Sequence, residues 1–114
     1  MCGRFTLTTA AADLAKRFQV ELAALPYAPS YNIAPSQQVL SVIHDGSTPR
    51  AGYLRWGLVP SWAPDPAIGQ RMINARVETV AVKPSFRPAL QRRRCLVLAD
   101  GFVEWRTQTT GQTP

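Results

Sequence analysis

The sequence predicts a single α+β domain that is rich in β-strands. Three observations support this prediction. The 114 residues fall within the usual size of one domain. Short runs of Val, Ile and Leu alternate with turn signals such as Asp45-Gly46 and Asp100-Gly101. One segment near the N-terminus has the spacing of an amphipathic helix. We therefore expect one domain over residues 1–114, without an internal repeat or linker.

The expected elements can be placed in chain order. A short helix is predicted at residues 10–18, because Leu14 and Phe18 are four residues apart and Thr8 and Thr9 stand where a helix cap is favoured. Four strands rich in β-branched or aromatic residues are predicted at 38–44, 50–58, 95–99 and 102–105.

Between the second and third of these strands, the sequence predicts mostly irregular chain. Three prolines within residues 60–66 predict a stiff loop that carries Trp62. This Trp could cap the core or form an exposed platform for stacking. A strongly basic run follows at residues 91–94, and such runs are most often solvated surface.

Composition and charge narrow the function classes. Hydrophobic residues make up 46% of the chain, which is typical of a globular protein, and no apolar run approaches a membrane span. No signal-peptide pattern is present, so we expect a cytoplasmic protein associated with the nucleoid. Thirteen basic residues, eleven of them Arg, face seven acidic ones, for a net charge of +6. Arg binds phosphate with a planar fork, so this surplus favours a nucleic-acid partner. A bias of the genome toward Arg codons is the alternative.

The metal-binding residues are few. The chain has two cysteines, Cys2 and Cys95, and one histidine, His44, which fit no familiar zinc spacing. We expect no metal and no cofactor.

The first five residues, Met1-Cys2-Gly3-Arg4-Phe5, carry an unusual chemical possibility. An initiator Met before a small residue is normally removed, which would leave Cys2 with a free α-amine beside its thiol. Both groups are partly nucleophilic near neutral pH. Such an aminothiol condenses with an aldehyde to an imine, which the thiolate closes to a thiazolidine ring. The alternative is that Cys2 is a small apolar residue at a frayed terminus.

Five motifs occur in one register along the chain. They are Met1-Cys2-Gly3-Arg4-Phe5, Tyr31-Asn32-Ile33-Ala34-Pro35, Trp56-Gly57-Leu58-Val59-Pro60-Ser61-Trp62, Ile73-Asn74-Ala75-Arg76-Val77-Glu78-Thr79, and Arg94 through Ala99-Asp100-Gly101-Phe102-Val103-Glu104-Trp105. Together they resemble the SRAP family (SOS response-associated peptidase), whose members shield abasic sites in single-stranded DNA.

The resemblance implies a fold and an activity. The fold would be a barrel-like sheet with flanking helices, incomplete in this chain, which matches the N-terminal portion of the family domain. The activity would be a covalent thiazolidine crosslink between Cys2 and the aldehyde of an abasic deoxyribose, a suicidal reaction of a family also linked to peptidase and lyase chemistry. Asn74 matches the family's site amide and Glu104 its acidic catalytic residue.

The resemblance also implies the DNA contacts. Arg4 and Arg76 match positions that hold phosphates, and Pro35 and Trp62 match the apolar elements that bracket the break in the base stack. Single-strand binders combine such charges with stacking platforms.

Two departures from the family pattern leave alternatives open. Val103 replaces the usual aromatic residue before the Glu, and the family's downstream catalytic His has no counterpart, since His44 lies in the wrong motif. The chain could therefore be a non-catalytic module that binds single-stranded DNA, or a thiol autopeptidase. A homodimer that completes the fold is a further expectation.

Overall fold

The structure is a computed structural model and describes residues 2–108 and 111–113. Its elements in chain order are β1 (Phe5–Leu7), α1 (Ala11–Phe18), β2 (Ser30–Ile33), β3 (Gln38–His44), β4 (Pro49–Arg55), the 3₁₀ helix η1 (Pro66–Arg71), α2 (Arg87–Arg92), β5 (Leu96–Val97), β6 (Gly101–Phe102), β7 (Arg106–Gln108) and β8 (Gly111–Thr113). The predicted α+β, strand-rich class is confirmed.

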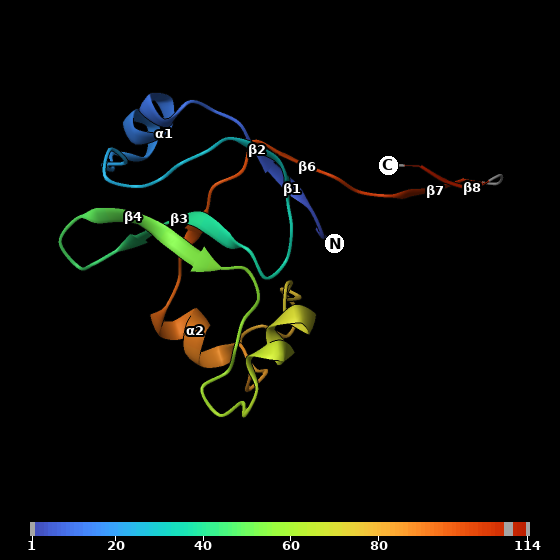
Figure 1. The fold of residues 1–114 in the computed structure, drawn as a ribbon. Coiled ribbons are helices and arrows are strands. Elements are labelled where there is room, and N and C mark those ends of the chain that lie inside the picture. The colour runs from blue at the N-terminus through green and yellow to red at the C-terminus, as the bar shows by residue number, and fades with distance from the viewer. Residues whose placement is uncertain (1, 109–110, 114) are drawn as a thin grey trace.

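The strands form two three-stranded sheets and a small hairpin. The sheet orders are β2-β1-β6 and β4-β3-β5, and β7 pairs with β8 in a hairpin that extends away from both sheets (Figure 1). Among the described residues, the two sheets do not join into a closed barrel. In the same part of the chain, no helix has the length and apolar character that a membrane crossing requires.

The β3–β4 hairpin is the most regular part of the fold. The two strands pair antiparallel from Gln38↔Arg55 to His44↔Pro49, as their sequence predicts. The Asp45 carboxylate accepts hydrogen bonds from the main-chain N–H groups of Ser47 and Thr48, both at 2.8 Å, which fixes the turn. Residues 39–42 of β3 are all buried, so this strand is covered on both faces.

Helix α1 closes one side of the core and begins one residue later than predicted. Leu14 packs in a buried cluster with Leu7, Leu40 and Leu98. The predicted Thr cap is wrong, because Ala10 occupies the cap position and no side chain caps the helix. The preceding Thr8 and Thr9 hydroxyls instead donate hydrogen bonds to Asp100.

The segment from β5 to β6 connects the two sheets. Val97 pairs with Ser41 of β3, and Phe102 pairs with Phe5 of β1. Between these pairings, the Leu98 N–H donates to the Leu40 carbonyl at 3.1 Å and the Asp100 N–H to the Thr6 carbonyl at 2.9 Å. Both strands are shorter than predicted. The sequence also suggested a buried strand at 95–99, whereas Leu98 alone is buried there.

Residues 56–94 form a second lobe that contains η1 and α2 (Figure 1). Strand β4 was predicted to reach residue 58 but ends at Arg55, because the chain turns at Gly57 with a φ of 131°. The sequence did not predict η1 or α2. Each has Pro in its first turn, where a missing N–H costs nothing. Pro66 opens η1, whereas Pro60 and Pro64 lie in irregular chain as predicted.

Candidate active site at the N-terminal strand

A cavity of about 720 Å³ lies beside the N-terminal strand. Its lining comes from four separated stretches of the chain and is mostly apolar: Cys2, Phe5, Trp56, Ile73, Asn74, Val97, Ala99, Asp100, Gly101, Phe102 and Glu104. The three predicted catalytic residues, Cys2, Asn74 and Glu104, thus lie around one cavity. A large pocket with few polar groups is the usual form of a site for a small reacting group.

Cys2 lies just before β1, at the point where that strand pairs with the chain beyond β6. Its thiol donates to the Arg4 carbonyl at 3.4 Å, and the same carbonyl accepts the Val103 N–H at 3.0 Å. The Cys2 side chain is half-buried. The strand pairing therefore brings Cys2 close to the segment that carries Glu104.

Asn74 makes the direct link between its own segment and Cys2. Its Nδ2 donates to the Cys2 carbonyl at 2.7 Å, a contact between residues 72 positions apart. Asn74 belongs to no helix or strand, so its direction depends on the residues around it. The main chain before it is held by two hydrogen bonds: the Trp56 indole N–H donates to the Ile73 carbonyl, and the Leu58 N–H donates to the Met72 carbonyl, both at 2.9 Å.

The turn between those two donors depends on glycine. Gly57 has a φ of 131°, and a Cβ built on it would lie 2.4 Å from the carbonyl oxygen of Gly69 in η1. The main chains of Gly57 and Gly69 therefore touch, and this contact fixes η1, which directly precedes Met72 and Ile73, against the turn that follows β4.

Asp100 lines the cavity and holds the chain after Cys2 in place, a role that the sequence did not predict. Its carboxylate accepts hydrogen bonds from the Thr6 hydroxyl at 2.7 Å and from the main-chain N–H groups of Thr8 at 2.6 Å and Thr9 at 2.9 Å. These donors, the Thr6 hydroxyl first, hold the pKa of Asp100 below its ordinary value. The only signal in the sequence was the turn pair Asp100-Gly101, which says nothing about partners more than 90 residues away.

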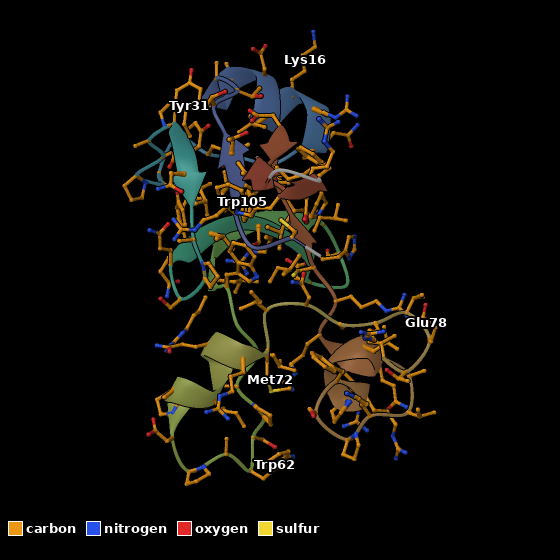
Figure 2. The ribbon with its side chains drawn as sticks, turned by 90° about the vertical axis from the view of Figure 1, so that its right-hand side faces the viewer. Lys16, Tyr31, Trp62, Met72, Glu78 and Trp105 are labelled. Atoms are coloured by element: carbon orange, nitrogen blue, oxygen red, sulfur yellow. The ribbon has the colours of Figure 1, made fainter. Side chains whose placement is uncertain are left out.

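The predicted DNA-binding residues lie outside the cavity lining. The Arg4 guanidinium donates to the Asn32 side chain at 2.8 Å and is exposed. Pro35 is half-buried in the loop between β2 and β3, and Arg76 is exposed in a turn. Trp62 is 63% exposed and lies at the far end of the second lobe, well away from Trp105 near the sheets (Figure 2). None of these four residues lines the cavity.

His44 lies in a different environment from the cavity. Its Nδ1 accepts the Gly46 N–H at 3.0 Å, and its side chain lines a separate pocket with Cys95. His44 is therefore not among the residues that line the cavity with Cys2. Within residues 2–108 and 111–113, no cluster of His, Cys, Asp and Glu is arranged to hold a metal ion.

The fold and cavity define a small α+β domain with a cysteine at the mouth of a mostly apolar pocket. The family model described as "SOS response associated peptidase (SRAP)" matches residues 1–114. The chain belongs to the SRAP family.

Several relatives carry names that refer to abasic sites. The chain is 53% identical over 108 residues to the abasic site processing protein YoqW of Bacillus subtilis (strain 168). The matched region covers 93% of this chain and 48% of YoqW. It is 40% identical over 100 residues to the abasic site processing protein HMCES of Xenopus tropicalis, covering 77% of this chain and 30% of the relative. The chain therefore spans about half the length of YoqW and less than half the length of HMCES.

A solved structure shows the same fold. A protein from Bacteroides thetaiotaomicron matches with a TM-score of 0.82 at 22% identity, over 97% of this chain and 51% of that protein. At this identity the likeness is evidence for the fold alone.

Proposed function

We propose that this chain recognises abasic sites in single-stranded DNA and crosslinks to them covalently through Cys2. The observation that carries the proposal is the 2.7 Å contact from Asn74 to the Cys2 carbonyl, in a cavity that Glu104 also lines. The names of the relatives, which refer to abasic site processing, support the same substrate.

The chemistry needs only groups at the mouth of this cavity. Once Met1 is removed, the Cys2 α-amine adds to the C1′ aldehyde of the ring-opened deoxyribose and gives a carbinolamine. Loss of one water yields an imine. The Cys2 thiolate then adds to the imine carbon and the imine nitrogen takes up a proton, which closes the thiazolidine. One water is released overall, and no redox step occurs.

Asn74 and Glu104 have distinct proposed roles in these steps. Asn74 anchors the main chain of Cys2, which reduces the motion of the amine and thiol relative to the aldehyde. Glu104 transfers protons when the carbinolamine loses water, a step that needs both a donor and an acceptor.

DNA binding would precede the reaction. Arg4 and Arg76 are exposed and can contact phosphates, while the exposed Trp62 can stack on a base and Pro35 can pack beside it. Because an abasic site keeps its phosphates but has lost its base, these contacts fit the substrate better than contacts to base edges would. Binding by charge should weaken as salt rises.

The crosslink can be tested on a denaturing gel. Wild-type protein incubated with an oligonucleotide carrying one abasic site should give a heat-stable shifted band, and Cys2→Ala should give none. A tetrahydrofuran abasic analogue, which has no aldehyde, should bind without forming the adduct. Intact mass should show the loss of Met1. If the wild type gives no more adduct than Cys2→Ala, the covalent proposal is wrong.

The non-catalytic alternative makes a different prediction. It expects salt-sensitive binding to both oligonucleotides and no adduct with either. A thiol autopeptidase would cleave the bond between Met1 and Cys2 and form no adduct with either oligonucleotide.

We also propose that a second copy of the chain packs on exposed apolar residues of β5, β6 and the chain that follows β6. These residues are Leu96, Val97, Phe102, Val103 and Trp105, which are between 38% and 70% exposed. Exposed apolar surface of this kind often marks an interface. Light scattering after size exclusion should give the mass of a dimer. A monomer mass at concentrations well above those of the DNA assay would refute this.

A further inference from the structure

We propose that Trp56 is the residue that positions Asn74 against Cys2. The proposal deepens the proposed function, because its kinetic consequence depends on the crosslinking reaction. Trp56 would act through Asn74 and not on the reacting atoms, so it is a positioning residue.

The first observation concerns the main chain in front of Asn74. The Trp56 indole N–H donates to the Ile73 carbonyl at 2.9 Å, one residue before Asn74. A carbonyl held by a side-chain donor fixes the plane of its own peptide group, which here joins Ile73 to the nitrogen of Asn74. Asn74 lies in no helix or strand, so no regular main-chain hydrogen bonds set the direction of its side chain. The bond from Trp56 to the Ile73 carbonyl takes their place.

The second observation concerns the other side of the indole. The rings of Trp56 and Phe5 are 5.1 Å apart between centroids at an angle of 55°. Phe5 is buried in β1, three residues after Cys2. Tilted aromatic pairs of this kind are favourable beyond the area that they bury. Trp56 therefore contacts both the strand that follows Cys2 and the segment that carries Asn74.

The third observation concerns the main chain of Trp56 itself. Its carbonyl accepts the Ser36 N–H at 2.8 Å, and its N–H donates to the Gln37 carbonyl at 3.0 Å. The next residue is the constrained Gly57. Because the backbone of Trp56 is held on both sides, the position of its indole ring is restricted. The indole N–H can therefore hold the Ile73 carbonyl, and with it Asn74, in one place.

A purely structural role for Trp56 predicts something different. If the ring only filled space, then phenylalanine, which keeps most of the ring, would leave Asn74 in place. If the N–H positions Asn74, Trp56→Phe should release the amide of Asn74 from the Cys2 carbonyl while the protein stays folded.

The test uses both NMR and kinetics. In ¹⁵N-labelled protein, the side-chain amide pair of Asn74 is identified by its loss in Asn74→Ala. In Trp56→Phe this pair should shift toward the position of an exposed amide and exchange faster with water. At saturating abasic DNA, the crosslinking rate should fall about 10- to 100-fold, as expected for a small misplacement, while the Kd for the tetrahydrofuran analogue stays unchanged.

Tyr53→Phe is the matched control. The Tyr53 hydroxyl donates to the Pro26 carbonyl at 3.2 Å, so this variant also removes one bond from an aromatic side chain to a carbonyl, but away from the cavity. It should change neither the Asn74 signals nor the crosslinking rate.

The proposal is overturned if Trp56→Phe folds and leaves the Asn74 amide signals as in the wild type. Should Trp56→Phe fail to fold, the indole N–H signal of Trp56 in the wild type decides the matter. Exchange of this N–H with water as fast as that of the exposed indole of Trp62 overturns the proposal, and slow exchange supports it. If the wild type forms no adduct, the proposed function fails, but the NMR comparison still tests the role of Trp56.

Discussion

Replacement of Gly57 by alanine tests whether the turn after β4 is set by its backbone conformation. With a φ of 131°, any L-residue at this position is strained, which typically costs about 1–3 kcal/mol. The new Cβ would also lie 2.4 Å from the Gly69 oxygen, so η1 must move, at a typical cost of about 1–3 kcal/mol for overpacking. We therefore expect Gly57→Ala to lower the free energy of unfolding by about 2–6 kcal/mol.

The measurement is urea unfolding followed by circular dichroism, with Gly52→Ala as the control. Gly52 lies in β4, and a Cβ built on it meets nothing within 4 Å. Alanine there should change the unfolding free energy by less than about 1 kcal/mol. If Gly57→Ala is no less stable than Gly52→Ala, the contact between Gly57 and Gly69 does not constrain the fold, and the reasoning is wrong.

Three other predictions follow from single side chains. Hydrogen bonds, with that of the Thr6 hydroxyl first, hold the pKa of Asp100 below its ordinary value. The ionised Asp100 carboxylate therefore stabilises the fold fully above about pH 4, the ordinary pKa of Asp. This stabilisation is lost as the pH falls toward the lowered pKa. In Asp100→Asn, thermal unfolding between pH 2 and 6 should therefore show less pH dependence than in the wild type, and an equal dependence would contradict this. Leu14→Ala should lower the unfolding free energy in urea by about 2–5 kcal/mol, because Leu14 is buried in the core; a loss below about 1 kcal/mol would argue against that packing. In salt titrations of single-stranded DNA binding, Arg4→Ala should reduce the slope of log K against log salt by about 0.7, the value for one lost phosphate contact, while Arg17→Ala on α1 should leave it unchanged.

Local patterns in the sequence were enough to predict the parts of the fold that depend on neighbouring residues. The β3–β4 hairpin was predicted because Asp45-Gly46 joins two runs of strand-forming residues, and its turn is held by bonds within four residues. Helix α1 was predicted because Leu14 and Phe18 share one face. In both cases the information lies within a few positions of the element that it specifies.

The parts that failed depend on distant partners. The hydroxyls of Thr8 and Thr9 were predicted to cap α1, but a carboxylate more than 90 residues away accepts their hydrogen bonds. Strand β4 was predicted to be longer than it is, because the stop comes from the contact between Gly57 and Gly69 and not from the residues of the strand.

The same division applies to the site. Cys2 was predicted from its place after the initiator Met, and Asn74 and Glu104 were predicted from the resemblance. All three line one cavity. Their support was not predicted, since Asp100 and Trp56 act through bonds to segments that no local pattern connects. The predicted DNA contacts remain predictions, because Pro35, Trp62 and Arg76 are not among the residues that line the cavity and no DNA is bound.

The two sides of the cavity differ in how completely they are built. On the Asn74 side, hydrogen bonds from Trp56 and Leu58 and the contact of Gly57 with Gly69 form a connected support that ends at the Cys2 carbonyl. On the Glu104 side, Phe102 lines the cavity and yet is 70% exposed, as an apolar wall would be before its partner packs against it. Since the proposed thiazolidine formation uses the amine and thiol of Cys2 itself, the supported side holds the groups that must be oriented. The other side carries Glu104, the proposed proton-transfer residue. A partner that covers Phe102 should therefore affect the rate of water loss from the carbinolamine more than the initial binding of DNA.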